Sequence, residues 1–288
     1  MNSRGSSCLI LSAPAKINLN LQVLSLRTDG YHELQTVMQK LELSDRITLR
    51  PSDSLTLSCP DSALPEGQDN LAYKAAQLFG EKTSGVPRVK IVIEKNIPVA
   101  AGLGGGSSDA GLVLKGLNSM FGSPFGNGEL EEMGGLLGAD VPFFVSDCKA
   151  ALATGIGDCL DVAQSVSGYW CLLVNPGYEV STKEVYNRFN QLTADKLALT
   201  RDNNFYKYVE FKNNLKLNCF NELESVTLAR YPELSELKES LMNYGALVSL
   251  LAGSGPTVFG LFADREKAVI CRDELADFYP VVILTRTQ

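Results

Sequence analysis

The sequence predicts an α+β fold, because runs with strand periodicity alternate with runs that have helical spacing, and because the C-terminal strands alternate with helices. Apolar residues at every second position from Ile17 to Val23 are typical of a half-buried strand, which we place at Ser7–Leu26 and end in a turn at Arg27–Gly30. The further N-terminal elements are strands at Ile47–Leu49 and Leu55–Leu57, read as a meander, a helix at Asn70–Phe79, a strand at Val89–Ile93, a helix after Ser108 and a helix at Glu129–Leu137.

The C-terminal part opens with a continuous apolar strand at Trp170–Val174, and we place a domain boundary shortly before it. The prediction is therefore two domains, at residues 1–165 and 166–288. The remaining elements are a helix at Leu234–Met242, a strand at Ala246–Leu251, a glycine turn at 253–255, a strand at Thr257–Phe262, a helix at Glu266–Phe278 and a strand at Val281–Thr285. This order favours an antiparallel α+β layer.

Composition excludes several classes of function. The chain of 288 residues carries 26 basic and 33 acidic residues, a net charge of -7, which argues against nucleic acid as a partner. Seven scattered cysteines without a Cys-x-x-Cys pair predict reduced thiols and a cytoplasmic location. No apolar run reaches membrane-spanning length or makes a signal peptide, so we expect no membrane partner. The single histidine, His32, excludes a zinc site built from several imidazoles.

A glycine-rich run, Gly102–Ser108, lies between a predicted strand and a predicted helix. Glycines let backbone amides approach a polyphosphate, and the helix N-terminus adds positive potential. We expect Ser107 or Ser108 to cap the helix. The alternative is a flexible turn, and the run matches neither a Walker A loop nor a dinucleotide fingerprint.

Three other segments contain residues suited to chemistry. Lys16 and Asn18 share one face of the first strand, where the alternative is a solvent-facing lysine. Asp140 is a carboxylate among apolar neighbours that could serve catalysis or only cap the segment beginning at Val141, a residue that Pro142 biases toward an extended conformation. The Gly253–Gly255 stretch could be no more than a tight turn between two strands.

Taken together, these segments resemble the three signature motifs of the GHMP kinases. The motifs are PAKINLNL at 14–21, PVAAGLGGGSSDA at 98–110 and AGSGPTVF at 252–259, and they occur in that order. Within that superfamily, RTDGYHELQT at 27–36, LGADVPFF at 137–144 and the 68–70 segment are similar to the diphosphocytidyl-methylerythritol kinases. The resemblance implies an N-terminal domain like domain 2 of ribosomal protein S5 and a ferredoxin-like C-terminal domain.

The resemblance also implies roles for individual residues. It implies a kinase that uses ATP and magnesium and phosphorylates a small molecule carrying a cytidine diphosphate group, at the 2-hydroxyl of its methylerythritol part. Asp140 would be the general base with Lys16 beside it, and Asn18 would orient the substrate. Residues implied to contact the nucleotide are Asn70, Lys95, Pro98, Gly102, Leu103, Gly104, Gly105, Gly106, Ser107 and Ser108. Those implied to contact the substrate further are Tyr31 and Tyr186, which would sandwich the cytosine, His32, which would bind its edge, and Gly253 and Gly255.

Two positions depart from the commonest pattern of the family, and three alternatives stay open. Tyr186 stands where phenylalanine is common, and Asp109 stands where asparagine is also common, which adds a negative charge near the expected phosphate position. The alternatives are another GHMP kinase of mevalonate or homoserine type, a non-catalytic sensor of nucleotide or metabolite, and an RNA-binding module. The sequence contains no indication of oligomeric state.

Overall fold

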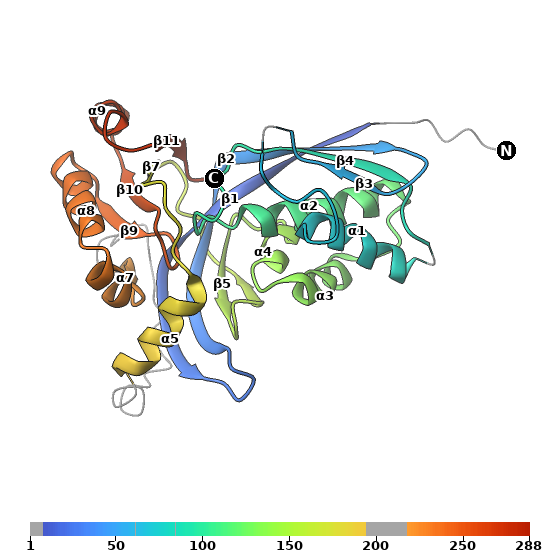
Figure 1. Ribbon diagram of the computed structural model, residues 1–288, viewed down its shortest axis with the longest axis horizontal. Coiled ribbons are helices and arrows are strands. Elements are labelled where there is room, and N and C mark those ends of the chain that lie inside the picture. Colours follow the sequence, from blue (N-terminus) through green and yellow to red (C-terminus); the bar gives the residue numbers. More distant parts are fainter. Residues whose placement is uncertain (1–7, 61, 84, 194–217) are drawn as a thin grey trace. The chain divides into compact units, whose positions relative to one another are not determined.

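The computed structural model describes residues 8–60, 62–83, 85–193 and 218–288 (Figure 1). Contacts divide the chain into two compact units. The first contains the chain up to Ala15, Leu43–Val99 and Gly104–Cys148, and the second contains Lys16–Glu42, Ala100–Leu103 and Lys149–Gln288. Strands β1 (Leu9–Leu26) and β2 (His32–Pro51) contribute residues to both units. The predicted boundary after residue 165 stays a prediction.

The strands of the first unit lie in the order β3–β4–β2–β1. Strand β4 (Val89–Glu94) runs antiparallel to β2 from Arg46↔Glu94 to Pro51↔Val89, and β3 (Thr56–Ser58) runs parallel to β4. The predicted meander of Ile47–Leu49 and Leu55–Leu57 is therefore wrong, because β4 lies between the two segments. Strand β2 is also much longer than the predicted segment Ile47–Leu49. The sequence did not predict its first half, because apolar and polar residues alternate poorly there, and this half is a strand because it pairs with neighbouring strands.

Four helices cover this sheet on one face (Figure 1). They are α1 (Leu71–Lys82), α2 (Gly105–Met120), α3 (Asn127–Leu137) and α4 (Val141–Val145). Their apolar sides and the inward residues of the strands form one core, to which Phe79, Ile91 and Leu114 contribute fully buried side chains. The three longer helices confirm the predicted helical segments.

Two predictions about helix ends in this unit are wrong. The N-cap of α2 is Gly104, in the left-handed region with φ 71°, and Ser107 and Ser108 lie inside the first turn. Glycine takes this conformation without the steric penalty that a Cβ would add. Val141 is helical rather than extended, because proline in the first turn of a helix removes an amide that would have no intrahelical partner.

In the second unit, β1 and β2 continue as neighbours and gain short partners. Strand β5 (Ala150–Thr154) pairs antiparallel with β2 through Thr36↔Ala153 and with β6 (Cys159–Val162), while β8 (Phe220–Asn221) runs parallel to β1. Both faces of β1 are buried from Ala13 to Leu21, so the expected half-buried strand is wrong in this stretch. Polar residues of the motif PAKINLNL are consequently interior residues.

A second sheet in this unit has the order β11–β7–β10–β9, and all its neighbours are antiparallel. The strands are β7 (Trp170–Asn175), β9 (Val248–Leu251), β10 (Val258–Phe262) and β11 (Val281–Arg286). Helices α8 (Glu233–Asn243) and α9 (Arg265–Ala276) pack on one face through Leu237, Leu241 and Cys271. This arrangement confirms the predicted antiparallel α+β layer.

Helices α5 (Thr182–Thr193) and α7 (Glu224–Arg230) were not predicted. Across the described residues, no helix is long and apolar enough to span a membrane.

Two helical glycines give opposite predictions for stability. A Cβ on Gly80 in α1 would lie 2.8 Å from Val86 Cα and 2.9 Å from the Gly85 carbonyl oxygen, whereas a Cβ on Gly135 in α3 would meet no atom within 4 Å. We expect Gly80→Ala to lower the free energy of unfolding by about 1–3 kcal/mol because backbone must move. Gly135→Ala should raise it by about 0.4–1 kcal/mol through lower unfolded-state entropy. Urea denaturation of both variants tests this, and a stabilised Gly80→Ala protein would contradict the close packing.

Candidate active site

In the first unit, the N-terminus of α2 has the geometry of an anion-binding site. Gly105, Gly106 and Ser107 are its first three residues, and the amides of a first helical turn have no intrahelical acceptors. A Cβ on Gly106 would meet nothing within 4 Å, and this glycine is exposed. The hydroxyl of Ser108 is buried and has no hydrogen-bond partner among the described residues. The sequence-predicted glycine run is thus well suited to hold phosphate groups here.

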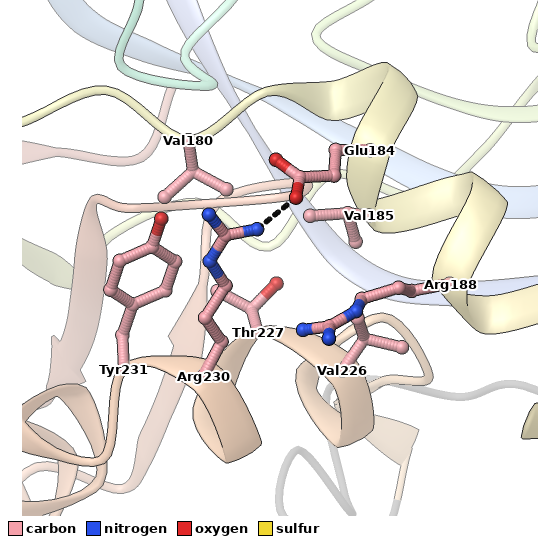
Figure 2. A pocket seen from close by; sticks show the side chains of 8 residues that line it. All are labelled: Val180, Glu184, Val185, Arg188, Val226, Thr227, Arg230 and Tyr231. Carbon is pink, nitrogen blue, oxygen red and sulfur yellow. Dashed lines mark hydrogen bonds and ion pairs between the residues drawn. The ribbon is translucent and has the colours of Figure 1, made fainter.

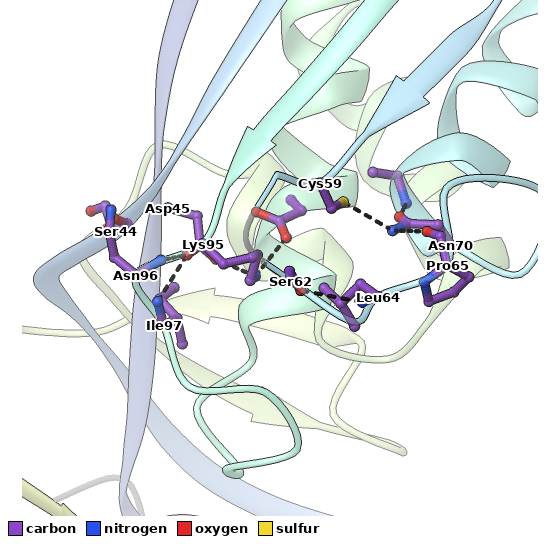
Figure 3. A network of polar contacts seen from close by, with 12 residues as sticks. Ser44, Asp45, Cys59, Ser62, Leu64, Pro65, Asn70, Lys95, Asn96 and Ile97 are labelled. Atoms are coloured by element: carbon purple, nitrogen blue, oxygen red, sulfur yellow. Dashed lines mark hydrogen bonds and ion pairs between the residues drawn. The ribbon is translucent and has the colours of Figure 1, made fainter. Parts of the chain in front are cut away.

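Lys95 lies close to this helix end, and two carboxylates hold its ammonium group. Figure 3 shows Lys95 beside one of them, Asp45. Its Nζ would be 3.3 Å from a Cβ on Gly105, donates to Asp109 Oδ2 at 2.8 Å and forms a short ion pair with Asp45 Oδ2. The side chains of Asp45, Asp109 and Lys95 are 0%, 4% and 9% exposed. Burial at this level makes charge pairing necessary, because an isolated ion would lose its hydration without compensation.

The electrostatics of this cluster are unequal for its two carboxylates. Burial, opposed by the charge of Lys95 and reinforced by that of Asp45, raises the pKa of Asp109 to about 7. Burial alone would lower the pKa of Lys95, but Asp109 and Asp45 outweigh it and raise that pKa. Lys95 therefore stays charged, and Asp109 is the group that titrates near neutral pH.

Asn70, expected to contact the nucleotide, has a structural role in α1. Its side-chain oxygen accepts a hydrogen bond from Ala72 N at 2.9 Å as the N-cap, and its Nδ2 donates to Pro65 O at 3.0 Å. Figure 3 shows Asn70 beside Cys59, in the view that also contains Lys95. A role toward adenosine stays a prediction. Pro98 is half-buried in the segment that precedes the glycine run.

Asp140 occupies the N-cap position of α4 in the first unit, yet its side chain does not cap that helix. Its backbone is right-handed helical with φ -79° and ψ -15°, and the residue is half-buried. The following turn is fixed by close packing, since a Cβ on Gly134 would lie 3.1 Å from Val141 Cγ1. Because no hydrogen bond to the Asp140 side chain caps α4, the interpretation of Asp140 as a helix cap alone is wrong. Lys16 belongs to the second unit, so the expected pairing of these two residues stays a prediction.

In the second unit, the start of the glycine run packs against the first and third motifs. The amide of Lys16 donates to Leu103 O at 2.9 Å. Gly102 has φ 76°, and a Cβ there would lie 2.2 Å from the carbonyl oxygen of Ala252. A Cβ on Gly253 would lie 3.8 Å from Gly102 O and 3.9 Å from Asn18 Oδ1. Segments of all three motifs therefore meet, and only glycine fits at position 102.

A chain of buried polar side chains positions the Lys16 ammonium. Lys16 is 6% exposed, and its Nζ donates to Asn18 Oδ1 at 2.8 Å. Asn18 Nδ2 donates to Thr36 Oγ1 at 2.8 Å, and Thr36 donates to Asn20 O at 2.5 Å. The solvent-facing alternative for Lys16 is wrong, because β1 is buried on both faces there. Networks of this kind hold a charged group in one orientation.

The residues expected to recognise cytosine also gather in the second unit. The rings of His32 and Tyr186 stack with centroids 4.8 Å apart and planes inclined by 29°. His32 Nε2 lies 2.6 Å from Asn190 Oδ1, while Tyr31, the preceding residue, is 62% exposed. Asn190 follows Tyr186 by one turn of α5, which places both on one face of the helix. Whether cytosine binds between Tyr31 and Tyr186 stays a prediction.

The third motif forms the expected tight turn between β9 and β10. Gly253 and Gly255 have φ 59° and 85°, and Asn221 Nδ2 donates to Gly253 O at 2.7 Å. The Ser254 hydroxyl lies 2.8 Å from Thr182 Oγ1, one turn before Tyr186 on α5. The turn is thereby tied to the helix that carries Tyr186.

A separate hollow lies between α5 and α7 (Figure 2). Arg230 forms an ion pair with Glu184 and lies over the ring of Tyr231, with 5.4 Å between its Cζ and the ring centroid. The residues that line the hollow are Val180, Glu184, Val185, Arg188, Val226, Thr227, Arg230 and Tyr231. The lining includes none of the residues that the sequence predicted for the site.

Comparison with known proteins agrees with this geometry. The model of the GHMP kinase N-terminal domain matches residues 70–147, and that of the C-terminal domain matches residues 205–281. A 4-diphosphocytidyl-2-C-methyl-D-erythritol kinase of Syntrophus aciditrophicus (strain SB) is 45% identical over 264 residues, which cover 90% of this chain and 92% of that protein. The chain belongs to the 4-diphosphocytidyl-2-C-methyl-D-erythritol kinase family. It is accordingly an ATP-dependent phosphotransferase with the two-domain α+β fold of the GHMP kinases.

A further member of this kinase family and a solved structure of such a kinase agree with this assignment, and a more distant structure shares the fold. The enzyme of the same name from Clostridium botulinum (strain Loch Maree / Type A3) is 40% identical over 283 residues, covering 97% of this chain and 100% of that protein. A crystal structure of 4-(cytidine 5'-diphospho)-2C-methyl-D-erythritol kinase is 31% identical with a TM-score of 0.80, and covers 97% of this chain and 99% of that chain. A homoserine kinase from Cytophaga hutchinsonii, 18% identical with a TM-score of 0.69 over 100% of this chain and 97% of that chain, shares the fold alone.

Several site-forming residues of this kinase were missed from sequence. Asp45, Thr36 and Asn20 lie in strands, where nothing in the local pattern separates a buried polar residue from an exposed one. Asn190 could have been found, because it follows Tyr186 by four residues in a helix of clear amphipathic spacing. Among the described residues, no group of three His, Cys, Asp or Glu side chains could hold a metal ion, so no protein ligand is assigned to magnesium.

The raised pKa of Asp109 predicts a pH-dependent stability. The folded chain keeps the Asp109 proton to about pH 7, whereas the unfolded chain releases it near the ordinary value of 3.8. The stability that this proton contributes is complete below about pH 4 and is lost as the pH rises to about 7. We expect Asp109→Asn to equal the parent near pH 4 and to exceed it by about 1–3 kcal/mol near pH 8. Urea denaturation across this range checks it, and parallel curves for the two proteins would contradict it.

Proposed function

We propose that this kinase transfers the γ-phosphate of ATP to the 2-hydroxyl of 4-diphosphocytidyl-2-C-methyl-D-erythritol, giving the 2-phosphate and ADP, in the non-mevalonate route to isoprenoid precursors. The observation that carries the proposal is the 45% identity, over 90% of the chain, to a kinase named for this substrate. The position of the glycine run at the N-terminus of α2 supports the nucleotide part. We assign residues 1–165 to an ATP-binding domain that also carries the substrate-binding first motif, and residues 166–288 to a C-terminal substrate-side domain.

The triphosphate binds along the glycine run in this proposal. Amides of Gly105, Gly106 and Ser107 point out of the first turn of α2, and the helix dipole adds positive potential there. Phosphoryl transfer has a loose transition state, so catalysis comes mainly from positioning and from compensation of charge on the transferred group. Magnesium supplies further charge compensation when it enters with the nucleotide.

Asp140 is proposed as the general base, with Lys16 as the positive group that stabilises charge on the reacting oxygen. The substrate hydroxyl oxygen forms a bond to the γ-phosphorus as the bond from that phosphorus to the bridging oxygen of ADP breaks, and the hydroxyl proton passes to Asp140. Support for Lys16 comes from its fixed position, held by Asn18 in a buried network.

Recognition of the cytosine ring is proposed for His32 and Tyr186, together with Tyr31. Stacking between an aromatic side chain and a base is sequence-tolerant, so specificity must come from polar groups at the edge of the base. His32 and Asn190 supply such groups beside the Tyr186 ring. Asn18 and the turn at Gly253–Gly255 line the substrate side in this proposal.

Substrate choice is tested by ADP release with a short panel of acceptors. We expect turnover with the cytidylyl compound and none with mevalonate or homoserine, and we expect CDP to compete with the true substrate. Tyr186→Leu should raise KM for that substrate by roughly tenfold to a hundredfold, because stacking on one base is worth about 1–3 kcal/mol.

The matched control is Tyr186→Phe, which keeps the ring and should change KM little. Turnover with mevalonate or homoserine alone would assign the protein to the nearest alternative activity. An unchanged KM in Tyr186→Leu would remove Tyr186 from cytosine recognition.

The role of Asp140 is tested by its amide. Asp140→Asn should lower kcat by about a hundredfold to ten-thousandfold, because the amide cannot accept the hydroxyl proton, while nucleotide binding is retained. Asp147→Asn is the matched control, since that carboxylate pairs with Lys115 at the surface of the same unit. Steady-state ADP release and nucleotide titration measure both effects. Equal kcat values for Asp140→Asn and the parent would exclude Asp140 as the base. If the parent itself shows no turnover, the alternative of a non-catalytic sensor of nucleotide or metabolite would be favoured.

A further inference from the structure

The buried cluster of Asp45, Lys95 and Asp109 contains two carboxylates and one ammonium group. All three side chains are at least nine-tenths buried and come from β2, from the segment after β4, and from α2. When both carboxylates are ionised, the cluster has one negative charge without a partner cation. Such a charge is unfavourable in a buried position, so one of the carboxylates is poised to bind a proton.

The hydrogen bonds decide which carboxylate that is. Asp45 Oδ1 accepts from the amides of Asn96 at 2.6 Å and Ile97 at 2.8 Å, and Asp45 Oδ2 accepts from Lys95 (Figure 3). Asp109 accepts from Lys95 through Oδ2 only, and no partner reaches its buried Oδ1 within the described part of the chain. Three donors therefore converge on the oxygens of Asp45, whereas Oδ1 of Asp109 has none and is open to protonation.

A further titratable group close to this cluster is the thiol of Cys59, the residue that directly follows β3. Burial, then the charges of Asp109 and Glu66, raise the pKa of Cys59, so the thiol stays protonated near neutral pH. Glu66 accepts a hydrogen bond from the Cys59 amide at 2.9 Å. Among the described residues, Lys95 and Asp45 are the charged groups that act on Asp109 itself. Near neutral pH, the titration of the cluster is therefore that of Asp109.

The cluster lies where a bound polyphosphate would act on it. Lys95 Nζ would be 3.3 Å from a Cβ on Gly105, the first residue of α2. Asp109 follows Gly105 by four residues, a rise of about 6 Å, on the same side of the helix. A polyanion on the first-turn amides therefore adds negative potential at Asp109 and favours its neutral form.

We propose that Asp109 takes up one proton from the solvent when a nucleotide polyphosphate binds at the N-terminus of α2, and that Asp45 is the positioning residue that keeps Lys95 from neutralising Asp109 alone. The O–H bond forms at Asp109, the buffer supplies the proton, and no bond of the nucleotide changes. Nucleotide affinity is then linked to pH through a side chain that does not touch the reacting atoms. This inference rests on the proposed binding of nucleotide at the glycine run.

The test is calorimetric titration of the full-length protein with ADP and magnesium, near pH 8, in two buffers of different ionisation enthalpy. The difference in apparent enthalpy gives the number of protons taken up. We expect roughly half a proton to one proton per nucleotide for the parent, and a nucleotide affinity that falls by up to about tenfold per pH unit above neutrality.

The variants separate the proton from the fold. Asp109→Asn should bind ADP with no proton uptake, an affinity independent of pH in this range, and tighter binding than the parent near pH 8. Asp45→Asn leaves Lys95 to pair with Asp109 alone, so its uptake should also be lost, and Asp109→Asn remains decisive if Asp45→Asn does not fold. Asp147→Asn, which alters a surface ion pair of the same unit, should keep the uptake of the parent.

The outcomes are distinguishable. Binding without proton uptake by the parent, or equal uptake by the parent and Asp109→Asn, would overturn the inference and leave the proposed function intact. Absence of ADP binding by the parent in either buffer would instead overturn the proposed nucleotide site, and the inference with it. If Asp109→Asn abolishes proton uptake but Asp45→Asn keeps the uptake of the parent, the positioning role of Asp45 would be overturned.

Discussion

The placement of one ammonium group between two buried carboxylates is the constraint on which the first unit depends. Lys95 joins Asp45 of β2 to Asp109 of α2, and Asp45 also binds the amides of Asn96 and Ile97. Removing Lys95 from this cluster would leave two buried carboxylates without a cation, which is far more destabilising than the loss of a surface pair. The start of α2, with its exposed amides, is therefore held at a defined place relative to β2 and β4.

In the second unit the equivalent constraint is steric. The carbonyl of Ala252 approaches Gly102 so closely that a Cβ has no room, and Leu103 accepts the amide of Lys16. Lys16 is then held by Asn18 and, through it, by Thr36. In both units a lysine is buried and its ammonium group is fixed by side-chain oxygens, of two carboxylates for Lys95 and of an amide for Lys16.

These arrangements explain why some local predictions were right and others wrong. The helix predicted at Asn70–Phe79 was right because its apolar residues have helical spacing, and Asn70 caps it, although no cap was predicted there. Ser107 and Ser108 have the same capacity, yet the cap is Gly104, because the approach to α2 requires a left-handed residue there. Val141 was expected to be extended, although proline in a first helical turn is compatible with the helix.

The sequence by itself determined the periodicity of β1, β4 and the main helices, the glycine run before α2, and three motifs specific enough to indicate the kinase family. Each of these depends on neighbours in the chain, within one turn or one strand. Only the tertiary structure decided that Lys16 is interior, that Asp45 completes the Lys95 cluster, and that Asn190 joins His32. Those contacts join residues 18 or more positions apart or depend on both faces of a strand being covered, and local sequence contains neither kind of information.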